Sequence, residues 1–135
     1  MGKTLAVLLA LGLAGCGGAL SREEYDKRGN NVLAHAIARV ELDKAAIRER
    51  PRDPAAYRTL AKDLRTFADQ LEAVGDPPQE LTARINRILD HMRGAASLFD
   101  GAADALGRND IATFRKKVAL ALQTIDRSAG SGMFG

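Results

Sequence analysis

Residues 81–106 read LTARINRILDHMRGAASLFDGAADAL and carry the longest apolar pattern at helical spacing in this 135-residue sequence. The apolar positions recur every three or four residues: Leu81, Ile85, Ile88, Met92, Ala95, Phe99, Ala102 and Leu106. This spacing places them on one face of an α-helix and predicts that this face lies in a core. A capping residue, Asp76, precedes Pro77, and Gly107 marks an end. We therefore predict a helix over residues 77–106, about 45 Å long at 1.5 Å per residue.

The segments on either side of this helix have the same pattern. Residues 54–74 follow the capping residue Asp53, begin with Pro54 and end before Gly75, and residues 110–127 follow Asn109 or Asp110, either of which can cap. Their apolar stripes are Tyr57, Leu60, Leu64, Phe67, Leu71 and Val74 in the first, and Ile111, Phe114, Val118, Ala121 and Ile125 in the second. Both segments are predicted to be helices that contribute one face to the core.

A further helix is predicted over residues 22–50. Ser21 and Glu24 form a capping-box pattern at its start, and Pro51 ends it. Its apolar line is Leu33, Ile37, Val40 and Ile47, with Lys44 in the intervening place. The run Gly29-Asn30-Asn31 argues against a continuous helix in its early turns.

Four helices joined by turns of about two to five residues favour antiparallel neighbours. The sequence therefore predicts an all-α fold over residues 21–128, an up-down-up-down antiparallel four-helix bundle, followed by a disordered tail at 129–135. Fragments at 53–57 and 106–110 resemble parts of a tetratricopeptide repeat. Its period of about 34 residues does not recur, and the helix at 77–106 is too long for that unit.

The first sixteen residues have the layout of a secretory signal. Lys3 supplies the positive charge, residues 5–13 an uncharged apolar run, and Ala14-Gly15 the small residues before a cleavage point. The apolar run is shorter than the roughly 20 residues that a membrane-spanning helix needs. We expect residues 1–15 to be a cleaved signal peptide and the mature chain to be extracytoplasmic.

Leu13-Ala14-Gly15-Cys16 resembles the lipobox of bacterial lipoproteins. The resemblance implies a diacylglyceryl group on the thiol of Cys16, further acylation by chains such as palmitate, and a short tether over residues 16–20. The alternative is an ordinary signal peptide followed by an incidental cysteine. Cys16 is the only cysteine, so a disulfide within the chain is excluded. Since Gly17 replaces the aspartate that commonly retains lipoproteins at an inner membrane, we expect the periplasmic face of an outer membrane, or the outer leaflet in a one-membrane cell.

Composition argues against a nucleic-acid partner. The net charge of +3 includes Lys3, which leaves about +2 in the mature chain, and the basic residues are interleaved with acids. Basic residues do recur in the last two helices, at Arg84, Arg87, Arg93, Arg115, Lys116, Lys117 and Arg127. They are interpreted as a solvated face, with a patch for anionic headgroups or wall polymers as the alternative.

The sequence contains no recognisable catalytic or metal-binding motif. His35 falls on the outer face of its helix and His91 at the edge of a core stripe, and neither belongs to a Glu-x-x-His pair or a C-x-x-C-H motif. Five acids lie off the apolar lines: Glu41, Asp43, Asp63, Asp69 and Glu72. Lys44, Arg39 and Arg65 are expected to pair on the surface with Glu41, Asp43 and Asp69 in that order. No G-x-S-x-G motif or phosphate-binding loop is present, so we predict no enzyme and no cofactor.

These features predict a membrane-anchored envelope lipoprotein whose helical domain is a non-enzymatic adaptor or accessory subunit for another envelope component. The alternative is a sensor or carrier that holds an apolar small molecule or haem inside the bundle. Small residues in the third helix could leave room for it: Ala95, Ala96, Ala102 and Ala103. Met92 is the conceivable haem partner of a histidine.

Overall fold

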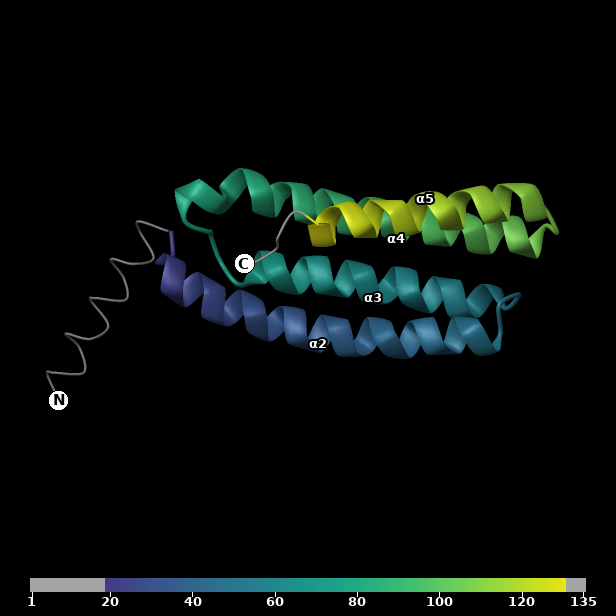
Figure 1. The fold of residues 1–135 in the computed structure, drawn as a ribbon, viewed down its shortest axis with the longest axis horizontal. Helices are drawn as coiled ribbons and strands as arrows, with labels where there is room; N and C mark the ends of the chain where they lie inside the picture. Colours follow the sequence, from purple (N-terminus) through teal and green to yellow (C-terminus); the bar gives the residue numbers. More distant parts are fainter. Residues whose placement is uncertain (1–18, 131–135) are drawn as a thin grey trace, which may run out of the picture.

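The computed structural model describes residues 19–130, and this part of the chain is all-helical, with no strand (Figure 1). Its elements are α2 (Arg22–Glu49), α3 (Pro54–Ala73), the short 3₁₀ helix η1 (Gln79–Leu81), α4 (Thr82–Gly107) and α5 (Ile111–Gly130). The four α-helices pack against one another. The predicted signal peptide, Cys16 and most of the predicted tail lie outside the described residues.

Side chains cap three of the four helices. The Ser21 hydroxyl accepts a hydrogen bond from the Glu24 amide (3.1 Å), and the Asp53 carboxylate accepts one from Ala55 (3.0 Å). At the start of α5, Asp110 and not Asn109 is the cap, because its carboxylate accepts from the Thr113 amide at 3.2 Å. Each acceptor satisfies an amide that has no partner inside its helix.

The start of α4 differs from the prediction. Asp76 caps nothing, and the chain stays extended to Pro78 before the turn of η1 leads into α4 at Thr82. A residue that precedes proline is pushed out of the helical region, so the two successive prolines delay the helix. The Asp76 carbonyl instead accepts from the Leu20 amide (3.1 Å), which ties the segment before α2 to the α3–α4 connection.

The predicted stripes of α3 and α4 form the core. Buried residues of these two helices include Tyr57, Leu60, Leu64, Phe67, Leu71, Ile85, Ile88, Met92, Ala95, Phe99 and Ala102. Phe114 and Ala121 of α5 complete this core, and the rings of Tyr57 and Phe114 meet edge to face with centroids 5.2 Å apart. α5 continues to Gly130, beyond the predicted end at 127.

The predicted face of α2 is only partly correct. Leu33, Val40 and Ile47 are partly buried and pack against the core, but Ile37 does not belong to the buried face. Ile37 is 53% exposed, and the buried residues of this helix are Tyr25, Gly29 and Asp43. The side of α2 that faces α3 also carries Val32 and Ala36, so it mixes small and polar residues with apolar ones. The predicted line beside it is the more apolar of the two, which is why spacing alone selected that line. The helix is continuous through Gly29-Asn30-Asn31, where the buried glycine lies against the rest of the protein.

The helices pack in chain order, α2 on α3, α3 on α4 and α4 on α5. Within these four described helices, no Cα of α2 lies within 8 Å of a Cα of α4 or α5. In Figure 1, α2 and α3 lie side by side, with α4 and α5 on the far side of α3. The side of the molecule between α2 and α5 is consequently open.

Ion pairs between different helices, among the described residues, all join α3 to α4. Arg65 bonds Asp100 at 2.6 Å, Arg58 bonds Asp104 at 2.9 Å, and Arg93 bonds both Asp69 and Glu72 at 2.9 Å. The predicted pairing of Arg65 with Asp69 is therefore wrong, because both side chains reach across to α4. These pairs are partly exposed and contribute at most about 1 kcal/mol each, but they all act on the α3–α4 pair.

Candidate functional site

An apolar groove runs along the open side between α2 and α5. It has a volume of about 320 Å³. Its lining comes from all four helices: Leu33, Ala36, Ile37, Val40, Glu41 and Lys44 of α2, Leu64 and Phe67 of α3, Met92 of α4, and Ile125 and Ser128 of α5. We call this set the apolar groove. The two charged residues of the lining, Glu41 and Lys44, pair with each other at 3.6 Å, as predicted. Apart from these two and Ser128, the lining is apolar.

Large apolar side chains at the groove are open to water. Ile37 lines it with half of its surface exposed, and Leu122, one turn before Ile125 on α5, is 43% exposed. Single exposed apolar residues are ordinary on a protein surface, but an apolar depression lined by such residues is typical of a binding surface.

The alanines expected to leave space do not line the groove. Ala95, Ala96, Ala102 and Ala103 are all fully buried, with no exposed surface. Small side chains allow helix backbones to approach closely, and here they serve the contacts of α4 with its two neighbours. The groove instead lies where α2 and α5 fail to meet.

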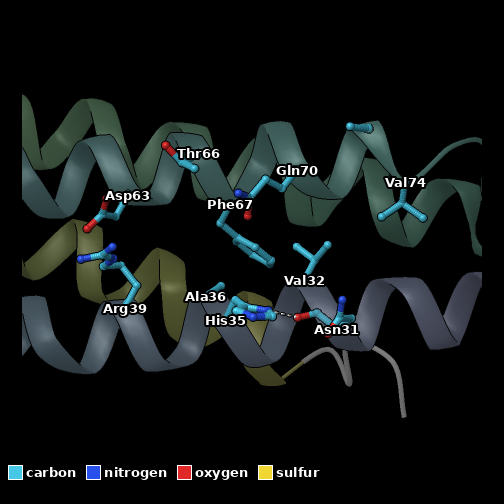
Figure 2. Close-up of a pocket in the computed structure, with 11 residues that line it drawn as sticks. Asn31, Val32, His35, Ala36, Arg39, Asp63, Thr66, Phe67, Gln70 and Val74 are labelled. Carbon is cyan, nitrogen blue, oxygen red and sulfur yellow. Dashed lines mark hydrogen bonds between the residues drawn. The ribbon is translucent and has the colours of Figure 1, made fainter.

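A second depression lies between α2 and α3, on the other side of α2. This polar cleft has a volume of about 680 Å³ and is lined by Asn31, Val32, His35, Ala36, Arg39, Asp63, Thr66, Phe67, Gln70, Ala73 and Val74. Figure 2 shows Arg39 and Asp63 extending from the two helices toward the same space, with Phe67 at the floor. Phe67 and Ala36 line both the polar cleft and the apolar groove. The α2 helix is thus flanked by a depression on each side.

Asp43 is the buried charged residue of α2, and it was expected on the surface. Only 6% of it is exposed, and its partner is the carboxyl group of Asp63 on α3, not the predicted Arg39. The pKa of Asp43 is raised to about 7, mainly by burial and in addition by the hydrogen bond and negative charge of Asp63, while the charge of Arg39 opposes the shift. Two carboxyl groups in contact favour a shared proton, and sequence spacing cannot reveal such a pair because they lie on different helices.

Neither histidine lines the apolar groove that contains Met92. His35 is exposed, and its Nδ1 donates to the Asn31 carbonyl at 2.8 Å (Figure 2). His91 is half-buried, and a 2.8 Å hydrogen bond joins its Nδ1 to the Ser128 hydroxyl of α5. Among residues 19–130, no three His, Cys, Asp or Glu side chains lie close enough to hold a metal ion.

The basic residues of α4 and α5 do not all share one environment. Arg93 is held by two carboxylates, which raise its pKa, and Lys117 is half-buried with its side chain near Gly101. Arg87, Arg115, Lys116 and Arg127 are exposed. A role for these four in attracting anionic surfaces stays a prediction.

The predicted lipid-attachment residue Cys16 and its neighbours Leu13, Ala14 and Gly15 lie outside the described residues. From Ala19 to Gly130, the structure contains no helix with the length and apolar character needed to span a membrane. No family model, no curated protein and no solved structure matches this chain.

Proposed function

We propose that this chain is a lipid-anchored envelope lipoprotein whose helical domain is a non-enzymatic adaptor. In this proposal Cys16 carries the acyl chains, residues 1–15 are removed, and the domain forms an up-down-up-down antiparallel bundle on the extracytoplasmic side of the membrane. Two or more acyl chains make such an anchor stable, whereas one gives only marginal binding. The partner is another envelope protein.

The observation that carries the adaptor role is the apolar groove. Its lining includes the half-exposed Ile37 of α2, and Leu122, one turn before Ile125 on α5, is a further exposed apolar residue. An amphipathic helix that docks in such a groove supplies apolar residues at intervals of three and four. Glu41 and Lys44 give the rim both signs of charge and can set the orientation of that helix.

A photo-crosslinking amino acid at position 37 in the living host tests this role. The expected result is a specific cross-linked protein, captured from position 37 and lost from a Cys16→Ser form that cannot be anchored. The same group at the neighbouring Ala38, which is exposed and lies outside the groove lining, is the control. Equal capture from both positions would count against the groove.

A matched pair of substitutions separates groove binding from general surface effects. Ile37→Glu places a charge in the groove, whereas Leu42→Glu places the same charge at a leucine that is 64% exposed and outside the groove lining. We expect the first to reduce capture of the partner at least tenfold and the second to leave it unchanged. A desolvated apolar anchor commonly contributes more than the corresponding 1.4 kcal/mol.

The second candidate is a carrier or sensor for an apolar small molecule. The groove volume falls at the lower end of the roughly 300–1,000 Å³ found for ligand pockets, and Phe67, Met92 and Leu64 form its floor. Haem is the weaker ligand, because no described lining residue is a histidine that could pair with Met92. A melting temperature that rises with an added fatty acid, and not in Ile37→Glu, would favour the carrier.

A further inference from the structure

The interface between α2 and α3 contains a buried carboxyl group with incomplete hydrogen bonding. Asp43 is nine-tenths buried, and its Oδ2 atom has no hydrogen-bond partner. Its Asp63 neighbour belongs to α3, so the carboxyl pair bridges the two helices. A buried polar atom left without a partner destabilises an interface, and a second negative charge beside it increases that cost.

No cation neutralises this pair within the described residues. Arg39 approaches from α2 and lowers the cost of ionisation, but it forms no ion pair with either carboxylate. Arg50 and Asp53, in the turn between the helices, line the small hollow that also contains Asp43. These two are already paired with each other at 3.9 Å. Asp43 thus faces two acidic groups, Asp63 and Asp53, and two basic groups, Arg39 and Arg50.

The helix that carries Asp43 is held weakly. Its ion pairs are internal to α2, and it has three buried residues, whereas α4 has ten. The apolar groove lies on one side of the contact between α2 and α3, and the polar cleft lies on the other. The short turn at residues 50–53 connects the two helices, and the Tyr57 hydroxyl of α3 donates to its Pro51 carbonyl at 2.7 Å.

We propose that α2 is a proton-controlled arm, which docks on α3 while the Asp43–Asp63 pair holds a shared proton and is released when both carboxylates are ionised. Loss of the proton places two negative charges in contact inside the interface, and separation of the helices relieves that repulsion because both groups regain water.

The direction of the pH dependence follows from the docked and released states. Asp43 has a pKa of about 7 when docked, against an ordinary value of 3.8 when exposed. The docked state therefore binds the extra proton between these values. The equilibrium constant for docking of α2 on α3 is therefore largest below about pH 4. It falls by up to about tenfold per pH unit between about pH 4 and pH 7, and it does not change further above about pH 7. Since α2 forms one wall of the apolar groove, the arm would also control partner binding, and only this consequence rests on the proposed function.

Amide hydrogen exchange of the full chain between pH 5 and 7.5 tests the arm without any partner. After correction for the intrinsic rate at each pH, protection of α2 peptides should fall toward neutral pH, by up to about 100-fold between pH 5 and pH 7, while α4 peptides change little. In Asp43→Asn the protection of α2 should be nearly independent of pH. A wild-type α2 whose protection does not change relative to α4 would overturn the proposal.

Two further variants keep the test decisive. Glu41→Gln removes an exposed acid two residues away on the same helix and should keep the wild-type pH dependence. Asp63→Asn removes the facing charge and should move the pH dependence of α2 protection to lower pH. This variant tests the proposal in place of Asp43→Asn if the latter does not fold. A slope in Asp43→Asn equal to that of Glu41→Gln would assign the pH dependence to another group and refute the role of Asp43.

Discussion

Ile88 and Ile37 are the same residue type in two different environments. Ile88 is 1% exposed in the middle of the α3–α4 core, whereas Ile37 lies at the groove with half of its surface in water. We expect Ile88→Ala to lower the free energy of unfolding by about 2–5 kcal/mol, because it removes buried methyl groups and leaves a cavity. Ile37→Ala should cost about 1 kcal/mol or less, since the side chain is already half hydrated.

Urea unfolding of both variants measures the difference. The comparison also checks the use of Ile37 as a probe of the groove, because a substitution there must leave the fold intact. Equal losses of stability in the two variants would mean that α2 is packed far more tightly than its exposed surface indicates.

At the scale of residues, the sequence predicts apolar contacts better than polar ones. The positions of Leu60, Phe99 and the other stripe residues follow from spacing along one helix. The partners of Arg65 and Asp43 do not, because Asp100 and Asp63 belong to other helices and their distance depends on how the helices pack. The same holds for the hydrogen bond between His91 and Ser128.

At the scale of elements, Gly94 offers a direct test of helix propensity in α4. It is exposed in the interior of the helix, and a Cβ built there would meet nothing within 4 Å. Gly94→Ala should therefore raise the free energy of unfolding by about 0.5–1 kcal/mol, because alanine loses less backbone entropy in a helix and meets no steric obstacle. The melting temperature from circular dichroism measures the gain.

Gly75 provides the opposite case for the same substitution. Its φ of +123° lies in the region that side chains rarely adopt, at the turn after α3. Gly75→Ala should lower the melting temperature, since the alanine must strain this turn. A Gly94→Ala protein less stable than wild type would indicate that α4 makes a contact at residue 94 that the structure does not show.

A comparison of α3 with α2 and α4 shows why the sequence predicts some helices better than others. In α3 every buried residue from Tyr57 to Leu71 is apolar, so spacing alone identifies the buried face. In α2 the inward row contains Gly29, Ala36 and Asp43, and a small or acidic residue carries no signal of burial. The late start of α4 depends on Pro78, where steric exclusion outweighs the capping pattern at Asp76.

At the scale of the whole molecule, the stabilising interactions are unevenly distributed. α3 and α4 share most of the core and all of the described ion pairs between helices, α5 packs on α4, and the backbone of α2 comes close to that of α3 only. The number of helices and their order follow from caps, prolines and short turns in the sequence. The groove between α2 and α5 cannot be predicted in this way, since it depends on the distance between the two outer helices. Local opening is expected to start at the element with the fewest buried contacts.

Limited trypsin digestion under native conditions at pH 8 tests this order of stability. Arg48 of α2 and Arg87 of α4 are both exposed arginines within helices, so they differ mainly in how firmly the helix around them is held. We expect the first cuts in α2 after Lys44 or Arg48, or in the turn after Arg52, whereas Pro51 blocks cleavage after Arg50. Cleavage needs an unfolded segment, and its rate follows the population of the open state when reclosing is fast. Early cleavage after Arg87 at the rate seen after Arg48 would place α2 and α4 in one cooperative unit and remove the basis for an independently moving arm.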